Sequence, residues 1–215
     1  MNKIITLVFF FIINSSSFAQ LSAGVAYGTF NTPGAERKLR GTAPTLSVTY
    51  TGDEETQQLY FDASLYKKEQ TGFETSIYDD QGMYIGSAQT TKQYSIIHLQ
   101  LGFKRSFAGN FDDSKFNGFV GGGIALSFNK VSFKYDYSGY KIPDDEIKRT
   151  MVGFHFSTGG QLHLKPVIIE IRGNFDLVLK PITIEGGDNK SNLLTSLRLG
   201  VLVPLTKHTS HHDGV

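Results

Sequence analysis

The chain has 215 residues, with 21 basic and 20 acidic side chains and neither cysteine nor tryptophan. A net charge near zero argues against a nucleic-acid-binding protein, which would carry a basic patch. The absence of cysteine excludes a lipoprotein, a disulfide-stapled domain and any metal site built on thiolates. No window holds about 18 consecutive apolar residues and the mean hydropathy is −0.17, so no transmembrane helix is predicted.

The N-terminus has the three parts of a secretory signal peptide. Lys3 supplies a positive charge, and residues 4–13 form a nearly unbroken apolar run. A polar stretch then leads to Ser17-Phe18-Ala19, which has small residues where signal peptidase requires them. The run is too short to cross a bilayer as a helix, which needs about 20 apolar residues. We therefore expect residues 1–19 to be a signal peptide cleaved after Ala19; without Lys3, basic and acidic residues are equal in number.

From Leu21 onward, apolar and polar residues alternate with the period of two that is typical of β-strands. Each segment of this kind is about 9–15 residues long, and a tilted strand needs about 9–11 residues to cross a membrane. The pattern therefore predicts an all-β domain over residues 20–205, followed by a polar periplasmic tail at 206–215. Eight segments are predicted: 21–30, 43–51, 57–68, 93–107, 116–129, 153–164, 167–179 and 193–205.

The connections between these segments alternate in length. In chain order they are about 12, 5, 24, 8, 23, 2 and 13 residues long. Outer-membrane barrels show the same alternation, because their periplasmic turns are short and their extracellular loops are longer. We therefore expect an eight-stranded antiparallel up-and-down transmembrane β-barrel in the cell outer membrane, with its long loops outside the cell.

The alternating faces differ in chemistry. In the seventh segment, Val167, Ile169 and Ile171 alternate with Glu170 and Arg172. Small residues, many of them glycine, accompany the charges on the polar face, and an eight-stranded barrel has an interior just wide enough for side chains to fill. We therefore expect the apolar face to meet lipid and the polar face to fill the lumen. The predicted interior polar network consists of Asp62, Lys104, Glu170, Arg172, Asp176 and Arg198.

The chain resembles the small OmpA/OmpX-like outer-membrane barrels, and most of all the outer membrane protein β-barrel domain family common in Bacteroidetes. The resemblance covers residues 20 to about 205 and rests on Ser17-Phe18-Ala19-Gln20, the eight segments and the last segment, 197–205. This last segment is similar to the C-terminal assembly signal of such barrels, although it ends in Leu205 and not in an aromatic residue. The resemblance implies the barrel fold and little about activity.

The connection 129–152 is the strongest candidate for an interaction site. Four large side chains alternate there, at Val131, Phe133, Tyr135 and Tyr137. Their phase differs from that of the apolar positions before them, which indicates a bulge or the membrane boundary near Asn129. A protruding strand edge would bind a partner by strand addition, as the OmpX-like resemblance also implies. The alternative is a hairpin whose aromatic side chains rest at the membrane interface.

Other features of the sequence favour no catalytic or metal site. The acidic groups at 79–80 and 144–146 suit solvated loop charges better than a calcium site. His155, with Ser157 two residues on, is the one catalytic candidate worth naming, and interior hydrogen bonding explains it better. The histidines at 208, 211 and 212 are ligand types without a fixed geometry. We therefore expect no enzyme activity, no cofactor and no metal.

The function predicted from the sequence is a structural or interaction barrel acting through long extracellular loops. Its expected partners are outer-membrane lipid, lipopolysaccharide and an extracellular protein, and the barrel is expected to be a monomer. Two alternatives remain open at this point: a narrow transport or secretion-accessory barrel, and a soluble lipocalin-like barrel that binds a ligand.

Overall fold

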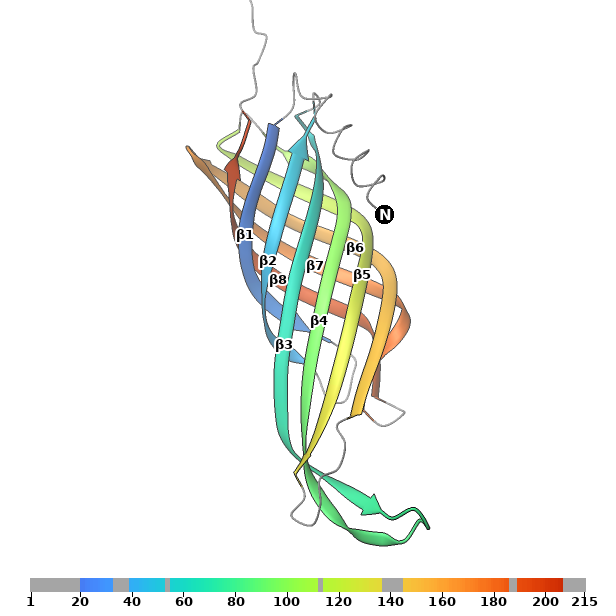
Figure 1. The fold of residues 1–215 in the computed structure, drawn as a ribbon. Helices are drawn as coiled ribbons and strands as arrows, with labels where there is room; N and C mark the ends of the chain where they lie inside the picture. Colours follow the sequence, from blue (N-terminus) through green and yellow to red (C-terminus); the bar gives the residue numbers. More distant parts are fainter. Residues whose placement is uncertain are drawn as a thin grey trace, which may run out of the picture.

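The computed structural model describes residues 20–32, 39–52, 55–111, 114–136, 145–185 and 189–206. Eight strands form one closed barrel in which each strand pairs with its sequence neighbours (Figure 1). The strands are β1 (Gln20–Asn31), β2 (Arg40–Thr51), β3 (Gln57–Tyr78), β4 (Tyr84–Ala108), β5 (Phe116–Asp136), β6 (Asp145–Leu164), β7 (Val167–Glu185) and β8 (Asn189–Pro204). The predicted signal peptide lies outside the described residues, as does the tail beyond Thr206.

All pairings are antiparallel, and the ring closes where β1 pairs with β8 from Ser22 opposite Pro204. Both ends of the domain therefore lie at the same rim, which in outer-membrane barrels is the periplasmic rim. The hydroxyl of Thr206 accepts a hydrogen bond from the Leu21 amide at 2.8 Å and ties the end of the domain to its start. The predicted fold class, an eight-stranded antiparallel up-and-down barrel, is confirmed.

Three of the four long connections are much shorter than predicted, because most of their residues continue the strands, whereas the first connection remains at 32–39. The connection expected at 69–92 narrows to 79–83, and those expected at 130–152 and 180–192 narrow to 137–144 and 186–188. The asymmetry between the two rims persists in another form: at the outer rim, β3 to β6 continue past the barrel wall as a projecting sheet (Figure 1). Polar sequence above a membrane lacks the apolar face that marks strands inside it.

The outer surface of the barrel is apolar. On β4, Ile97, Leu101 and Phe103 are 47%, 44% and 63% exposed, whereas the intervening His98 and Gln100 are at most 2% exposed. A lipocalin-like barrel has the reverse arrangement, with apolar side chains inside. The structure therefore excludes that alternative and gives the barrel an exterior suited to hydrocarbon. None of the described residues forms a helix long and apolar enough to cross a membrane.

Candidate functional site

The barrel interior holds a buried ion network at mid-height. The carboxylate of Asp62, on β3, accepts hydrogen bonds from Arg172 and, at 3.2 Å, from Arg198. Its other oxygen accepts a hydrogen bond from Ser47 at 2.7 Å. All four side chains are at most 5% exposed. Because charges buried in a lumen must be paired to be tolerated, Asp62 holds two cations that would otherwise be uncompensated.

A second ion pair lies on the periplasmic side of the first. The Lys104 ammonium is 2.5 Å from Glu170 and 4.8 Å from the centre of the Phe119 ring. Glu170 also accepts a hydrogen bond from Gln161 at 2.6 Å, and its other oxygen lies 3.2 Å from Nε of Arg172. Through Arg172 the two groups become one network, so every charge in it has an opposite charge nearby.

Asp176 does not join a cation from the predicted set and instead pairs with two histidines. Its carboxylate lies 2.7 Å from Nδ1 of His155 and 3.3 Å from Nε2 of His98. Gln100 donates a further hydrogen bond to it at 2.7 Å, and His98 contacts Ser127 at 2.6 Å. The six residues predicted for the interior thus all lie there, and five of them make direct ion-pair contacts with one another. The interior hydrogen bonding expected for His155 is confirmed, and His98, on the same polar face of the sequence pattern, completes the network.

Above the polar network, toward the outer rim, the lumen is filled by apolar side chains that the sequence did not reveal. Tyr66 stacks on Phe30 with ring centres 4.5 Å apart, and both are at most 5% exposed. Val131 packs against this cluster from β5. The buried members of this outer cluster are Phe30, Leu39, Ala43, Tyr66, Tyr94, Ile96, Met151, Val178 and Leu194. The polar interior is therefore capped by an apolar layer on the outer side.

Aromatic side chains also lie near the periplasmic rim. Phe111, from the turn after β4, and Phe119, from β5, are both fully buried with ring centres 6.2 Å apart. The Phe111 amide donates to the Glu55 carbonyl at 2.8 Å, which joins two periplasmic turns. The polar network is thus covered by buried side chains on both sides, a filling that disfavours free diffusion through the lumen.

The predicted interaction residues lie on the projecting sheet, but not at its edge. β5 pairs with β4 up to Asp136 and with β6 up to Phe133, and its register shows no shift near Asn129. Of the two alternatives expected near Asn129, the bulge is therefore wrong, and the membrane boundary stays a prediction. The expectation that strand five is an edge is wrong, because β5 is paired on both sides. Val131, Phe133 and Tyr135 keep the inward phase of the lower strand; Tyr137 lies outside the described residues.

The edges of the projecting sheet belong to β3 and β6. Pairing of β3 with β2 reaches only to Ser64, although β3 continues to Tyr78. Pairing of β6 with β7 begins at Gly153, although β6 begins at Asp145. On the inner face between these edges, the Lys92 ammonium lies 4.1 Å from the centre of the Phe73 ring. Cation–π contact of this kind stabilises an aromatic face above the barrel.

The remaining catalytic and metal-site candidates from the sequence have roles in the fold. His155 is fully buried inside the barrel, away from the lipid-facing rim where an enzyme acting on lipid would need it. Asp79 accepts hydrogen bonds from the amides of Gln81 and Met83, at 2.9 and 2.8 Å, and shapes the β3–β4 turn. Among the described residues, no group of three or more potential ligands is arranged to hold a metal ion.

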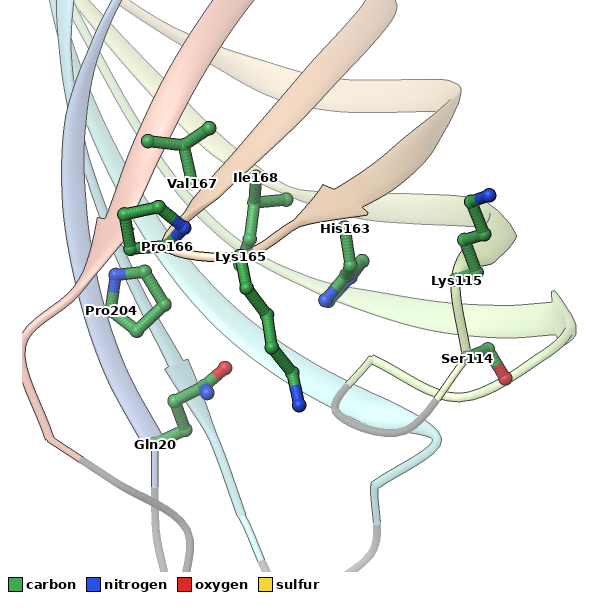
Figure 2. Close-up of a pocket in the computed structure, with 9 residues that line it drawn as sticks. All are labelled: Gln20, Ser114, Lys115, His163, Lys165, Pro166, Val167, Ile168 and Pro204. Atoms are coloured by element: carbon green, nitrogen blue, oxygen red, sulfur yellow. The ribbon is translucent and has the colours of Figure 1, made fainter.

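A shallow pocket of about 260 Å³ lies at the periplasmic rim, far from the projecting sheet. Figure 2 shows it between the start of β1, the end of β8 and the turns before β5 and β7. Its lining includes the basic or ionisable side chains of Lys115, His163 and Lys165. Lys115 and Lys165 therefore lie at the opposite end of the barrel from the projecting sheet.

A closed antiparallel ring with an apolar exterior and a charged, filled interior defines the class of the molecule: an eight-stranded outer-membrane β-barrel. Solved structures show the same fold. Neisserial surface protein A aligns with a TM-score of 0.50 and 16% identity, over 86% of this chain and 96% of its own. Ail of Yersinia pestis, in complex with the heparin analogue sucrose octasulfate, aligns with a TM-score of 0.51 and 12% identity, over 86% and 97%.

OprG of Pseudomonas aeruginosa is more distant, with a TM-score of 0.46 and 9% identity over 87% of this chain and 94% of its own. No family model matches the sequence, and no curated protein matches it. At these identities the similarity identifies the fold, and the activity must be argued from the residues themselves.

Proposed function

We propose that this barrel is a non-catalytic interaction platform, and that the projecting sheet of β3 to β6 is the part that meets a partner. The observation that carries the proposal is a pair of strand edges. Within the described residues, pairing of β3 with β2 ends at Ser64 and pairing of β6 with β7 begins at Gly153, so the parts of β3 beyond Lys68 and of β6 before Lys148 are edges above the membrane. Exposed strand edges present unpaired backbone groups to another chain. Such edges bind extended segments by strand addition, with the main chain supplying the affinity.

The β6 edge is the better of the two for a protein partner. Its pairing with β5 is regular from Phe133 opposite Asp145 onward, whereas β3 has a register shift between Gln70 and Phe73. A regular edge offers a partner strand a continuous row of backbone hydrogen-bonding groups, and a bulge interrupts such a row. We therefore move the proposed interaction site from Val131, Phe133 and Tyr135 to the neighbouring strand, β6, and assign these three side chains to the inner face of the sheet.

Transport is the weaker alternative because apolar and aromatic side chains cover the polar interior on both sides.

We also infer that the barrel acts as a monomer and belongs with the Bacteroidetes β-barrel domain family that its sequence resembles. Support for the family comes from the signal-peptide pattern and the last segment, 197–205.

Site-specific photo-crosslinking in cells tests the platform. A photoreactive residue replaces Ile147 on the β6 edge, Thr71 on the β3 edge, or Leu101 on the lipid-facing wall as the matched control. We expect protein adducts from the edge positions, most from Ile147, and only lipid adducts from Leu101. A variant in which an Asn-Gly turn replaces residues 132–146 should lose the adducts while the barrel still folds. Protein adducts absent from both edges would contradict the proposal.

A further inference from the structure

Three lysines lie in one row across the outward face of β3 to β6. Lys67 is opposite Ser95, Ser95 is opposite Lys130, and Lys130 is opposite Lys148. Neighbouring strands lie about 4.8 Å apart, so the row brings three ammonium groups to one side of the barrel. All three lysine side chains are exposed. We call Lys67, Lys130 and Lys148 the lysine row.

The lysine row begins where the lipid-facing surface ends. On β3 and β5, each lysine is the next outward-facing residue after the last apolar one, Leu65 and Phe128, which are 38% and 41% exposed. On β6, Lys148 is the second outward-facing position beyond Val152, which is 50% exposed. Lysine side chains at such a boundary lay their methylene groups on apolar surface and present the charge to headgroups. The row therefore sits at the level of the outer headgroups.

The electrostatics of the row leave it with an excess of positive charge. Lys130 and Lys148 are directly opposite each other, an arrangement that is unfavourable for like charges. One carboxylate, that of Glu146, contacts both ammonium groups, the Lys148 contact being 2.6 Å long. Hydrogen bonds from these lysines hold the pKa of Glu146 below its usual value. Glu146 and Glu69, the next outward-facing residue after Lys67, both lie one row farther from the membrane than the lysines. Three lysines against two carboxylates leave the row with an excess of one positive charge.

We propose that the lysine row binds the phosphate groups of lipid A in the outer leaflet. The position at the edge of the apolar wall selects a lipid headgroup, because the acyl chains of the same molecule would cover Leu65, Phe128 and their neighbours. The charge selects a phosphate, since anionic headgroups attract lysines that border a membrane-spanning segment. The inference rests on the membrane placement of the barrel and not on the partner of the projecting sheet.

Native mass spectrometry of the refolded mature protein in detergent, titrated with bisphosphorylated lipid A, tests this proposal. Each lysine should contribute about five-fold in affinity, so K130Q/K148Q should weaken lipid A binding at least ten-fold. K115Q/K165Q removes the same charge at the periplasmic rim and should bind as wild type does. Dephosphorylated lipid A should bind weakly to all three proteins.

Glu146→Gln should raise the affinity for lipid A, because it leaves Lys130 and Lys148 without their shared carboxylate. This variant should bind bisphosphorylated lipid A a few-fold more tightly than wild type. Heat-modifiable gel mobility confirms that each variant is folded. Equal losses in K130Q/K148Q and K115Q/K165Q would overturn the proposal, as would equal binding of the two lipids. Row-dependent binding of sucrose octasulfate without any preference for the phosphorylated lipid would overturn it in favour of a soluble polyanion.

Discussion

Arg172 and Asp62 are 110 residues apart in the sequence and form an ion pair inside the barrel. One lies on β7 and the other on β3, so their contact joins opposite walls across the lumen. Arg198, from β8, shares the same carboxylate at 3.2 Å. Side chains in the interior thus link strands on opposite sides of the barrel, in addition to the backbone hydrogen bonds that link neighbouring strands.

Asp62→Ala should destabilise the barrel strongly because it leaves Arg172 and Arg198 without their shared partner. Removing one member of a buried ion pair costs about 3–5 kcal/mol, and this carboxylate serves two cations. Urea unfolding in lipid vesicles, followed by heat-modifiable gel mobility, measures the loss. Asp80→Ala, at an exposed position in the β3–β4 turn, is the control and should change the free energy of unfolding little. A similar small change for both variants would contradict the role given to Asp62.

Gly123→Ala should also destabilise the barrel, for a steric reason. A Cβ atom at Gly123 would lie 2.0 Å from the carbonyl oxygen of Leu101 on the neighbouring strand. Overpacking of this kind costs about 1–3 kcal/mol or more, because strand backbone must move. At Gly173 the nearest atom would be 3.9 Å away, so Gly173→Ala is the matched control. Equal midpoints of urea unfolding for the two variants would show that β4 and β5 do not approach as described.

Leu101→Arg should lower the free energy of unfolding more than Leu65→Arg does, although both replace an exposed leucine on the outer wall. An arginine on the lipid face costs about 2–4 kcal/mol at the bilayer midplane and about 0–1 kcal/mol near the interface. Leu101 lies toward the middle of the apolar wall, and Leu65 lies next to the lysine row. Urea unfolding in lipid vesicles measures the free energy of unfolding of both variants. A larger loss for Leu65→Arg would contradict the membrane depths assigned to the two residues.

Planar-bilayer recordings of the refolded protein should show no steady single-channel steps. The outer cluster around Tyr66 and Phe30 and the buried pair Phe111 and Phe119 fill the lumen on either side of the polar network. Ions would therefore meet apolar side chains at two levels. Reproducible open steps that persist after removal of contaminating porins would favour the transport alternative.

The sequence predicted the membrane-spanning parts of the strands and the side to which each residue points, because a period of two fixes both once one face must meet lipid. It did not predict where the strands end. Residues 69–92 lie outside the membrane, where no apolar face is required, so strand and loop look alike in composition.

The internal layering could not be predicted either. Tyr66 and Met151 lie at inward-facing positions that a single strand gives no reason to separate from those of Asp62 or His155. Only the register between strands places the apolar residues together near the outer rim and the charged ones below them. The apparent phase change at Asn129 has the same origin: the strand keeps its phase, and Val131 is an apolar residue at an inward-facing position that packs on this cluster.

Nitroxide scanning along β4 tests the central claim, a membrane-spanning barrel with a polar interior, most directly. Since the sequence has no cysteine, single cysteines at 97–104 can each be labelled uniquely in protein refolded into vesicles. We expect collision with lipid-dissolved oxygen to be high at 97, 99, 101 and 103 and low at the positions between them, with little access for a water-soluble nickel complex at the odd positions. High nickel access at the odd positions, as on a barrel surrounded by water, would contradict the account.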